Sequence, residues 1–264
     1  MAEIVSISNQ KGGVGKTTSA VNLAASLVAA EKTCLLVDCD PQGNATTGLG
    51  LDPGELSPGL YDLLLGSAPP DSALVHTPLP GLALIGADAN LIGAEVEIAS
   101  TPDREFRLRS ALLPLKERFD FIFLDCPPSL GFLTLNALTA ADALLVPLQC
   151  EYYALEGLSK LMQTLNAVKR GLNPSIRLSG ILLTMHDTRN NLSLQVEQEV
   201  RDHFKDLVYQ VVIPRNVRLS EAPSHGLPAL LYDIKSKGAQ SYLALAREFM
   251  SRGVRIDDQE KSAR

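Results

Sequence analysis

The stretch "SNQKGGVGKTTSAVNLAA", residues 8–25, decides the fold because it connects an apolar strand to a helix through a glycine-rich turn. The residues just before it, 3–8, are "EIVSIS", and the residues after the turn repeat apolar side chains at helical spacing. Three glycines, Gly12, Gly13 and Gly15, allow backbone conformations that direct several amide groups inward. Together with the positive end of the following helix, these amides predict a binding site for phosphate groups.

The turn ends in Gly-Lys-Thr-Thr, as a P-loop does, but its first position differs from the usual pattern. That pattern places a glycine where this chain has Gln10, and an additional lysine, Lys11, follows. Lys16 is expected to pair with the β and γ phosphates, Thr17 to supply a hydroxyl to Mg²⁺, and Thr18 to contact the α phosphate. The residues of the turn that we predict to contact ATP are Lys11, Gly12, Gly13, Val14, Gly15, Lys16, Thr17 and Thr18.

Aspartates follow two further apolar strands, at the edge of the sheet where the phosphates would lie. "LLVDCDPQGN" carries Asp38 and Asp40, and "FIFLDCPPS" carries Asp125. A buried carboxylate is costly unless it meets a cation or donors, so Asp125 is expected to hold Mg²⁺ with Thr17, through water. Asp40 is predicted to orient the attacking water, the alternative being a cap of the following turn. Asp38 is predicted to contact the metal's water molecules or Lys16, the alternative being a structural role in the turn.

Apolar runs alternate with helix-period segments along most of the chain. Continuous apolar strands are buried on both faces and their alternation with helices favours right-handed crossovers, so we expect an α/β fold whose mostly parallel sheet is flanked by helices on both faces. Predicted strands lie at 3–8, 33–40, 82–87, 119–127, 143–150, 178–184 and 208–214, and predicted helices at 16–30, 103–118, 155–171, 190–205 and 238–252. The Gly/Pro-rich segment 50–81 is expected to be irregular, with a short helix near 60–65. Residues 1–252 are predicted to form one domain and residues 253–264 a polar, disordered tail.

The composition indicates a soluble protein of the cytosol. Four cysteines lie in or beside apolar runs without the spacing of a zinc or disulfide framework, which predicts buried reduced thiols. The start, "MAEIVSIS", does not resemble a signal peptide, and no run reaches the ~20 apolar residues of a spanning helix. The net charge is −6, but the acidic excess lies before residue 150 and the remainder is slightly basic, so a polyanion would meet the second half.

Four motifs occur in order along the chain: "KGGVGKTT", "VDCDPQGNAT", "FIFLDCPPSLG" and "VIPRNVRLSEAPSHG". Together they resemble the ParA/Soj chromosome- or plasmid-partitioning ATPases, a branch of the deviant Walker-A family that also contains MinD. The resemblance runs from residue 3 to about 252. It implies a P-loop NTPase fold, ATP and Mg²⁺ as cofactors, and an ATP-dependent homodimer in which Lys11 of one chain reaches the phosphates bound by the other. Lys11, Lys16 and Asp40 would be the catalytic residues of an ATPase with weak intrinsic turnover.

The same resemblance implies further contacts in the second half of the chain. Glu151 would meet a ribose or the opposite chain, the alternative being the start of a helix. Pro214, Arg215 and Asn216 would line the adenine, the alternative being a plain turn.

The resemblance also implies partners. Arg189 and Arg218 would bind double-stranded DNA without sequence preference, and a ParB/Spo0J-like centromere-binding protein would stimulate hydrolysis, which places the protein in the cytoplasm at the nucleoid. Basic residues that would broaden the DNA-binding surface are Lys205, Lys235, Lys237, Arg247 and Arg252.

Three other classes of protein use the same scaffold. A MinD-like membrane positioner is disfavoured because "GVRIDDQEKSAR", after the last predicted helix, has almost no apolar face for a lipid surface. An iron-sulfur electron carrier is disfavoured because the cysteines lie within or beside strands. A metabolic ATP-dependent enzyme would not need Lys11. Partitioning of DNA is therefore the favoured function.

Overall fold

The computed structural model describes the backbone of residues 1–262 and the side chains of residues 1–252. Its centre is a seven-stranded sheet in the order β3-β4-β2-β5-β1-β6-β7. Neighbouring strands pair in parallel except β3, which is antiparallel to β4. The strands are β1 (Glu3–Ile7), β2 (Cys34–Asp38), β3 (Val75–His76), β4 (Leu82–Ile85), β5 (Phe121–Asp125), β6 (Ala143–Gln149) and β7 (Arg177–Thr184). The mostly parallel sheet predicted from the sequence is confirmed.

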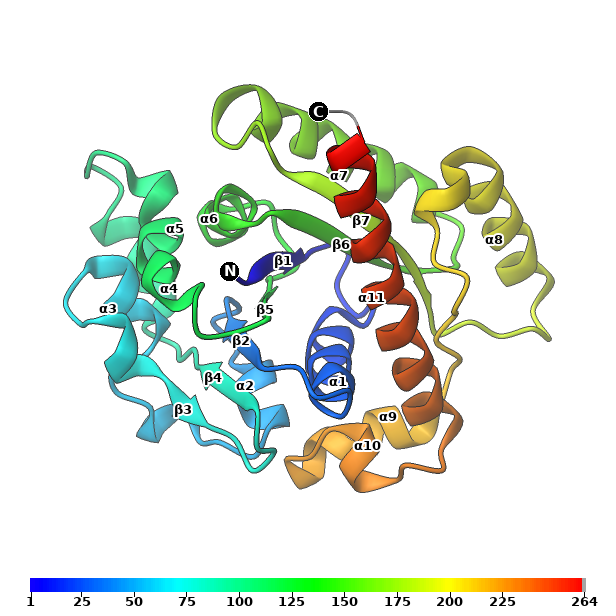
Figure 1. The fold of residues 1–264 in the computed structure, drawn as a ribbon, viewed down its shortest axis with the longest axis horizontal. Coiled ribbons are helices and arrows are strands. Elements are labelled where there is room, and N and C mark those ends of the chain that lie inside the picture. The colour runs from blue at the N-terminus through cyan, green and yellow to red at the C-terminus, as the bar shows by residue number, and fades with distance from the viewer. Residues whose placement is uncertain (263–264) are drawn as a thin grey trace.

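Helices cover both faces of this sheet, as predicted (Figure 1). On one face, α1 and α11 lie against each other and pack on the sheet with the short helices α2, α9 and α10. On the other face, α3 to α8 pack over a second apolar core. The helices are α1 (Lys16–Val28), α2 (Asn44–Gly48), α3 (Leu60–Leu65), α4 (Leu91–Glu97), α5 (Arg107–Leu112), α6 (Phe132–Ala140), α7 (Ala154–Gly171), α8 (Asn191–Phe204), α9 (Val217–Glu221), α10 (Ala229–Tyr232) and α11 (Lys237–Ser262). Short 3₁₀ helices are η1 (Pro53–Glu55), η2 (Pro70–Ala73), η3 (Arg104–Phe106), η4 (Leu113–Leu115), η5 (Lys205–Leu207) and η6 (Ala222–His225).

The strand register brings the predicted site residues to one edge of the sheet. Asp125, the last residue of β5, lies opposite Ile7 at the end of β1 and opposite Asp38 at the end of β2. Strands β1, β2 and β5 are almost completely buried, which explains their continuous apolar sequences. Because the three strands end at the same level, the loops that follow them converge on one site.

The segment 208–214, predicted as a strand, is not one. One isolated parallel bridge joins Val208 to Ile181 in β7 and another joins Pro214 to His186, just after β7. Between them, the backbone amides of Gln210 and Val211 donate to the carboxylate of Glu248 on α11, each at 2.9 Å. In a regular strand the amide of Val211 would point toward β7, as the amides of Tyr209 and Ile213 do. The strand prediction is therefore wrong because a side chain distant in the sequence takes these donors.

Two helical predictions also differ from the structure. The segment 103–118 is broken into η3, α5 and η4, and Pro114 lies within η4, where a continuous α-helix would need its missing amide. Helix α11 continues through Ser262, past residue 252, where the predicted disordered tail begins. No proline interrupts that stretch, so its sequence is compatible with a helical backbone. Positions 263 and 264 of the predicted tail lie outside the described residues.

All four cysteines are buried free thiols, as the sequence predicts. Within residues 1–262, no helix combines the length and the apolar character needed to cross a membrane.

Candidate nucleotide and metal site

The glycine-rich turn lies between the end of β1 and the start of α1, and its backbone follows the conformation expected of a phosphate-binding loop. Gly13 and Gly15 have positive φ angles of 73° and 84°, which glycine adopts without strain. The Lys16 ammonium donates to the carbonyl of Lys11 at 3.1 Å, so it bends back over the turn. Burial lowers the pKa of Lys16, and the nearby carboxylates of Asp125 and Asp40 oppose this effect.

Neighbouring strands hold the turn in place. Thr184 at the end of β7 donates its hydroxyl to the carbonyl of Val14 at 2.8 Å. The amide of Asn9 donates to the carbonyl of Pro147 in β6 at 2.7 Å, and its oxygen accepts from the Lys11 amide. These contacts fix both ends of the turn to the sheet, so the amides of the loop are ordered before a ligand arrives.

Asp125 has the environment of a cation ligand. Its carboxylate is fully buried, and neither oxygen has a hydrogen-bond partner among the described residues. Burial raises the pKa of Asp125 well above its usual value, with Asp38 adding to the effect and the hydroxyl of Thr17 opposing it. A buried carboxylate without donors is costly, and a divalent cation shared with the Thr17 hydroxyl would satisfy it. The residues present therefore fit Mg²⁺.

Asp38 is equally buried but is already satisfied. One oxygen accepts from the amide and hydroxyl of Thr46 at 2.9 and 2.8 Å, and the other accepts from the amide of Asp40 at 3.1 Å. Burial raises the pKa of Asp38 to about 6, and the hydrogen bonds from Thr46 and Asp40 oppose this shift. The contacts shown here are those of the structural alternative, in which Asp38 ties β2 to α2. Its contact with the metal's water molecules stays a prediction.

Asp40 lies where the pocket meets the turn. Its Oδ1 accepts from the amide of Gln42 at 3.0 Å, and its side chain lines the pocket. Its Oδ2 has no hydrogen bond within the described part of the chain, so this oxygen can accept from a ligand or from water. Asp40 thus both stabilises the turn and presents an acceptor to the pocket.

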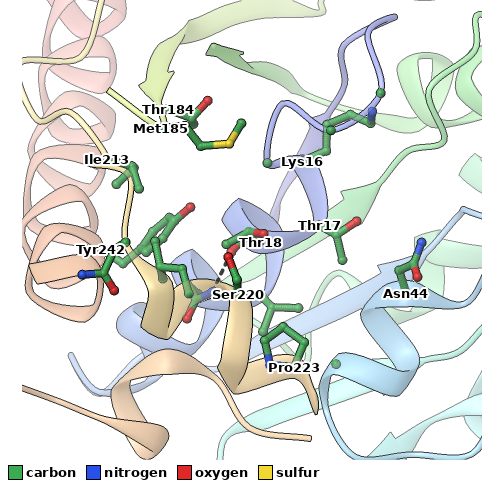
Figure 2. Close-up of a pocket in the computed structure, with 18 of the residues that line it drawn as sticks. Lys16, Thr17, Thr18, Asn44, Thr184, Met185, Ile213, Ser220, Pro223 and Tyr242 are labelled. Atoms are coloured by element: carbon green, nitrogen blue, oxygen red, sulfur yellow. Dashed lines mark hydrogen bonds between the residues drawn. The ribbon is translucent and has the colours of Figure 1, made fainter. Parts of the chain in front are cut away.

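A pocket of about 650 Å³ extends from the turn to the other end of the candidate site (Figure 2). Across the pocket from Thr17 and Thr18 lie Met185 and Ile213. The predicted adenine loop, Pro214, Arg215 and Asn216, also lines the pocket. The pocket therefore joins the predicted phosphate and adenine residues in one cavity of the size of a nucleotide site.

Several lining residues were not predicted from the sequence: Asn44, Thr47, Pro128, Thr184, Met185, Leu219, Pro223 and Tyr242. They come from several helices, from the end of β7 and from loops that meet at the pocket only in the folded chain. One signal was available for Thr184, since it ends a predicted strand on the ligand-binding edge of the sheet, and Met185 follows it directly.

Lys11 and Glu151 contact each other within one chain. The Lys11 ammonium forms a hydrogen bond and ion pair with Glu151 Oε2, just before α7. Both side chains are about two-fifths exposed, at 43% and 42%. The structure thus brings together Lys11, predicted to reach the phosphates of a second chain, and Glu151, predicted to meet a ribose or the opposite chain.

The two arginines predicted to bind DNA are exposed but paired. The guanidinium of Arg189 is 86% exposed and donates to both oxygens of Asp187, at 2.9 and 2.8 Å. The guanidinium of Arg218 is half exposed and pairs with Glu221 at 2.7 Å and with Asp233 at 3.3 Å. DNA phosphates would have to compete with these carboxylates.

Among the additional basic residues, Lys205, Lys235, Lys237 and Arg247 are exposed. Arg252 is only partly exposed, at 20%, and its contribution to a DNA-binding surface stays a prediction. Its guanidinium is bound by Glu248 and by the carbonyls of Asp206 and Val208, and it lies 4.0 Å from the centre of the Tyr209 ring. These contacts explain why this arginine is mostly buried.

Comparisons with known proteins agree with this geometry. Residues 2–178 match the family model described as an AAA domain. The chain is 58% identical to a chromosome partitioning protein ParA of Myxococcus xanthus, over 96% of this chain and 89% of that protein. It is 53% identical to the sporulation initiation inhibitor protein Soj of Bacillus subtilis, over 96% of this chain and 100% of that protein.

A solved structure with a different name is also similar. Cobyrinic acid a,c-diamide synthase of Mycobacterium smegmatis, with bound ATP analogue and magnesium, is 39% identical and superposes with a TM-score of 0.83, covering 94% of this chain and 93% of that one. The sequence identity is higher to the proteins named ParA and Soj. With its P-loop between β1 and α1 and its parallel sheet, the chain belongs to the ParA/Soj family of partitioning ATPases, on the deviant Walker-A P-loop fold.

Proposed function

We propose that this protein is a Mg²⁺-dependent ATPase that partitions DNA, with weak intrinsic turnover. The observation that carries the proposal is the buried Asp125 carboxylate, which has no hydrogen-bond partner in the described part of the chain and faces Thr17 at the end of the P-loop. A site built for an uncharged ligand would not place a fully buried carboxylate without a hydrogen-bond partner there.

Each residue of the pocket has a role in this proposal. The amides of residues 12–15 and the Lys16 ammonium bind the phosphates, with Thr18 at the α phosphate, and Pro214 to Asn216 hold the base. Mg²⁺ held by Thr17 and Asp125 would neutralise charge on the β and γ phosphates. The Asp40 carboxylate orients the attacking water through its available oxygen.

ATP drives formation of a symmetric homodimer in which Lys11 contributes to the phosphate site of the partner chain. Lys11 already lies at the exposed lip of the turn, and its ammonium is paired with an exposed carboxylate that a triphosphate can outcompete. The γ phosphate adds negative charge that draws the Lys11 ammonium from Glu151 to the nucleotide of the partner chain. ADP lacks this phosphate and therefore supports association less well.

The dimer binds double-stranded DNA without sequence preference through Arg189 and Arg218, supplemented by the exposed lysines and Arg247. Two copies of a weak patch on one rigid dimer bind more tightly than either alone. A ParB/Spo0J-like partner stimulates hydrolysis and releases the dimer, which makes the protein cytoplasmic and nucleoid-associated in its ATP state.

The decisive test is a filter-binding titration of Asp40→Ala protein against two unrelated duplexes, with ATP and with ADP. We expect binding to both duplexes in ATP, a steep loss as salt rises, and little binding in ADP. Lys11→Ala should remove the ATP-dependent doubling of mass in light scattering. Equal binding in both nucleotides, or none in ATP, would refute the partitioning function and favour a metabolic ATP-dependent enzyme, the class named by the Mycobacterium smegmatis structure, or a MinD-like positioner.

A further inference from the structure

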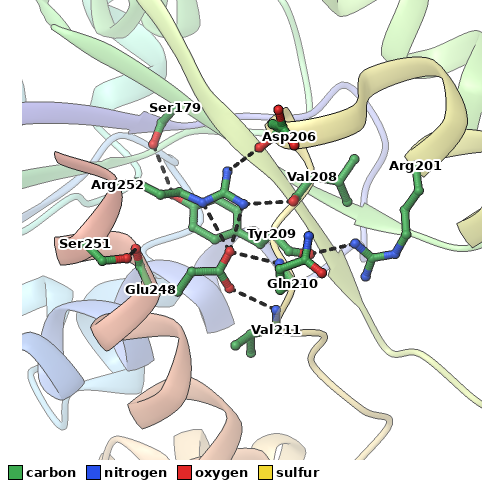
Figure 3. A network of polar contacts seen from close by, with 10 residues as sticks. All are labelled: Ser179, Arg201, Asp206, Val208, Tyr209, Gln210, Val211, Glu248, Ser251 and Arg252. Atoms are coloured by element: carbon green, nitrogen blue, oxygen red, sulfur yellow. Dashed lines mark hydrogen bonds and ion pairs between the residues drawn. The ribbon is translucent and has the colours of Figure 1, made fainter. Parts of the chain in front are cut away.

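A half-buried polar network connects α11 to the segment that leads into the pocket (Figure 3). The carboxylate of Glu248 accepts from the amides of Gln210 and Val211, and the guanidinium of Arg252 donates to the same carboxylate at 2.7 Å. Arg252 also donates to the carbonyl of Val208 at 2.8 Å. We name the pair Glu248 and Arg252 the α11 clamp.

The α11 clamp supplies a hydrogen-bond acceptor to the backbone of residues 210 and 211, as a neighbouring strand does elsewhere in the sheet. The amide of Tyr209 donates to the carbonyl of Ile181 in β7, and the amide of Ile213 donates to the carbonyl of Leu183, so β7 holds the segment at two points. Between these points the clamp takes both backbone donors of Gln210 and Val211. Val211 is half-buried and Glu248 is the acceptor of its amide, so loss of that carboxylate would favour a shift of this part of the segment.

The backbone that the clamp holds is close in sequence to residues that line the pocket. Val211 is separated from Ile213 by one residue, and Ile213, Pro214 and Arg215 line the pocket. The loop is also held by His186, just after β7, whose amide donates to the carbonyl of Ile213 at 3.0 Å and whose carbonyl accepts from the amide of Arg215 at 3.1 Å. A displacement at Val211, two residues before Ile213, would strain these contacts and disturb the lining of the pocket.

We propose that the α11 clamp is a positioning device for the base-binding loop, so that Glu248 and Arg252 set the affinity for the base moiety of a nucleotide without touching it. This inference rests on the proposed nucleotide site. It assigns to α11 a function beyond covering the sheet, and it predicts that loss of the clamp affects one end of the pocket only.

Two ligands distinguish the ends of the pocket. Inorganic pyrophosphate should contact the turn at residues 12–18 alone, whereas ADP should also contact the loop at 214–216. Both bind without hydrolysis, so calorimetric titration gives dissociation constants for each. Binding of both ligands by the parent protein tests the proposed site, and the comparison of variants tests the clamp.

The first test variant is Glu248→Gln, which replaces one of the two acceptor oxygens by an amide group that can only donate. The second is Arg252→Lys, which keeps the charge but loses the planar guanidinium and its several hydrogen bonds. We expect each to weaken ADP about tenfold, the effect of one lost charge-assisted hydrogen bond, and to leave pyrophosphate within twofold of the parent. Phe249→Leu is the matched control, since Phe249 is next in α11 but packs against Phe121 and Phe123 in the core.

The control should lower the thermal unfolding midpoint while leaving both dissociation constants unchanged. Unchanged ADP affinity in Glu248→Gln and Arg252→Lys would overturn the proposal. So would an equal weakening of ADP and pyrophosphate, because that pattern indicates a general loss of structure. If the parent protein binds pyrophosphate and ADP with equal affinity, the assignment of the base-binding end of the pocket is overturned as well.

Discussion

Asp125→Asn is expected to make the ligand-free protein more stable while it abolishes the response to Mg²⁺ and ATP. The variant keeps the shape of the side chain and removes a buried charge that has no hydrogen-bond partner within the described residues. An unsatisfied buried polar group costs about 1–3 kcal/mol, and a charged one costs more. We therefore expect a gain of about 1–3 kcal/mol in the free energy of unfolding, which raises the melting temperature by roughly 2–4 °C per kcal/mol in a chain of this size.

The gain in the free energy of unfolding that Asp125→Asn produces should increase with pH. Burial raises the pKa of Asp125 above its unfolded value, so the folded protein binds a proton that the unfolded chain releases. For such a group the stability is complete below the unfolded pKa and is lost as the pH rises through the folded pKa. The advantage of Asp125→Asn over the parent should therefore grow from pH 5 to pH 8.

Differential scanning calorimetry with and without Mg²⁺-ATP measures both effects. Ligand at about a hundred times its dissociation constant should stabilise the parent by about 2.7 kcal/mol and the variant far less. Asp120→Asn is the control, because Asp120 accepts from the amide and hydroxyl of Thr33, at 2.7 and 3.0 Å, and should lose stability. The reasoning is refuted if Asp125→Asn melts no higher than the parent, or if it responds to Mg²⁺-ATP as the parent does.

Three further outcomes follow from the structure. Burial raises the pKa of Asp38 to about 6, so the free energy of unfolding should fall as the pH rises from 4 to 7. Asp38→Asn should reduce this fall, and urea titrations that show the same pH dependence as in the parent would contradict the prediction. Gly226→Ala should destabilise the protein by about 1–3 kcal/mol or more, because the new Cβ would lie 2.4 Å from the Gly50 Cα at a φ of 65°, and an unaltered urea midpoint would count against it. Asp187→Asn should strengthen DNA binding by the ATP-bound protein several-fold and steepen its salt dependence, since it releases Arg189, and filter binding that is weaker than in the parent would show that the ion pair is needed to orient the arginine.

The parts of the fold that sequence reasoning predicted depend on local patterns. The P-loop, the buried strands β1, β2 and β5 and helix α1 are each specified by residues close together in the chain. The register of parallel strands then places their ends at one edge, so the meeting of the P-loop with Asp125 needed no information beyond the sequence.

The parts that could not be predicted depend on partners far away in the chain. Asp38 and Asp125 end similar apolar strands, yet Thr46 satisfies one and no described residue satisfies the other. The segment 208–214 has a strand-like sequence, and Glu248 determines that it is not a strand. Arginine is likewise a residue type usually found at the surface, and only the contacts of Arg252 in the folded chain show that it holds the backbone at Val208 and packs on Tyr209.

The ion pair between Lys11 and Glu151 limits how strongly two copies of this chain can associate in the proposed dimer. Each lysine would leave one carboxylate for a triphosphate, so association exchanges one ionic contact for another and gains only the difference between them. Half-exposed pairs contribute little individually, so that difference is small compared with the free energy of a permanent interface. Such an exchange favours a dimer that forms and dissociates readily, with a lifetime set by the charge on the bound nucleotide rather than by buried area.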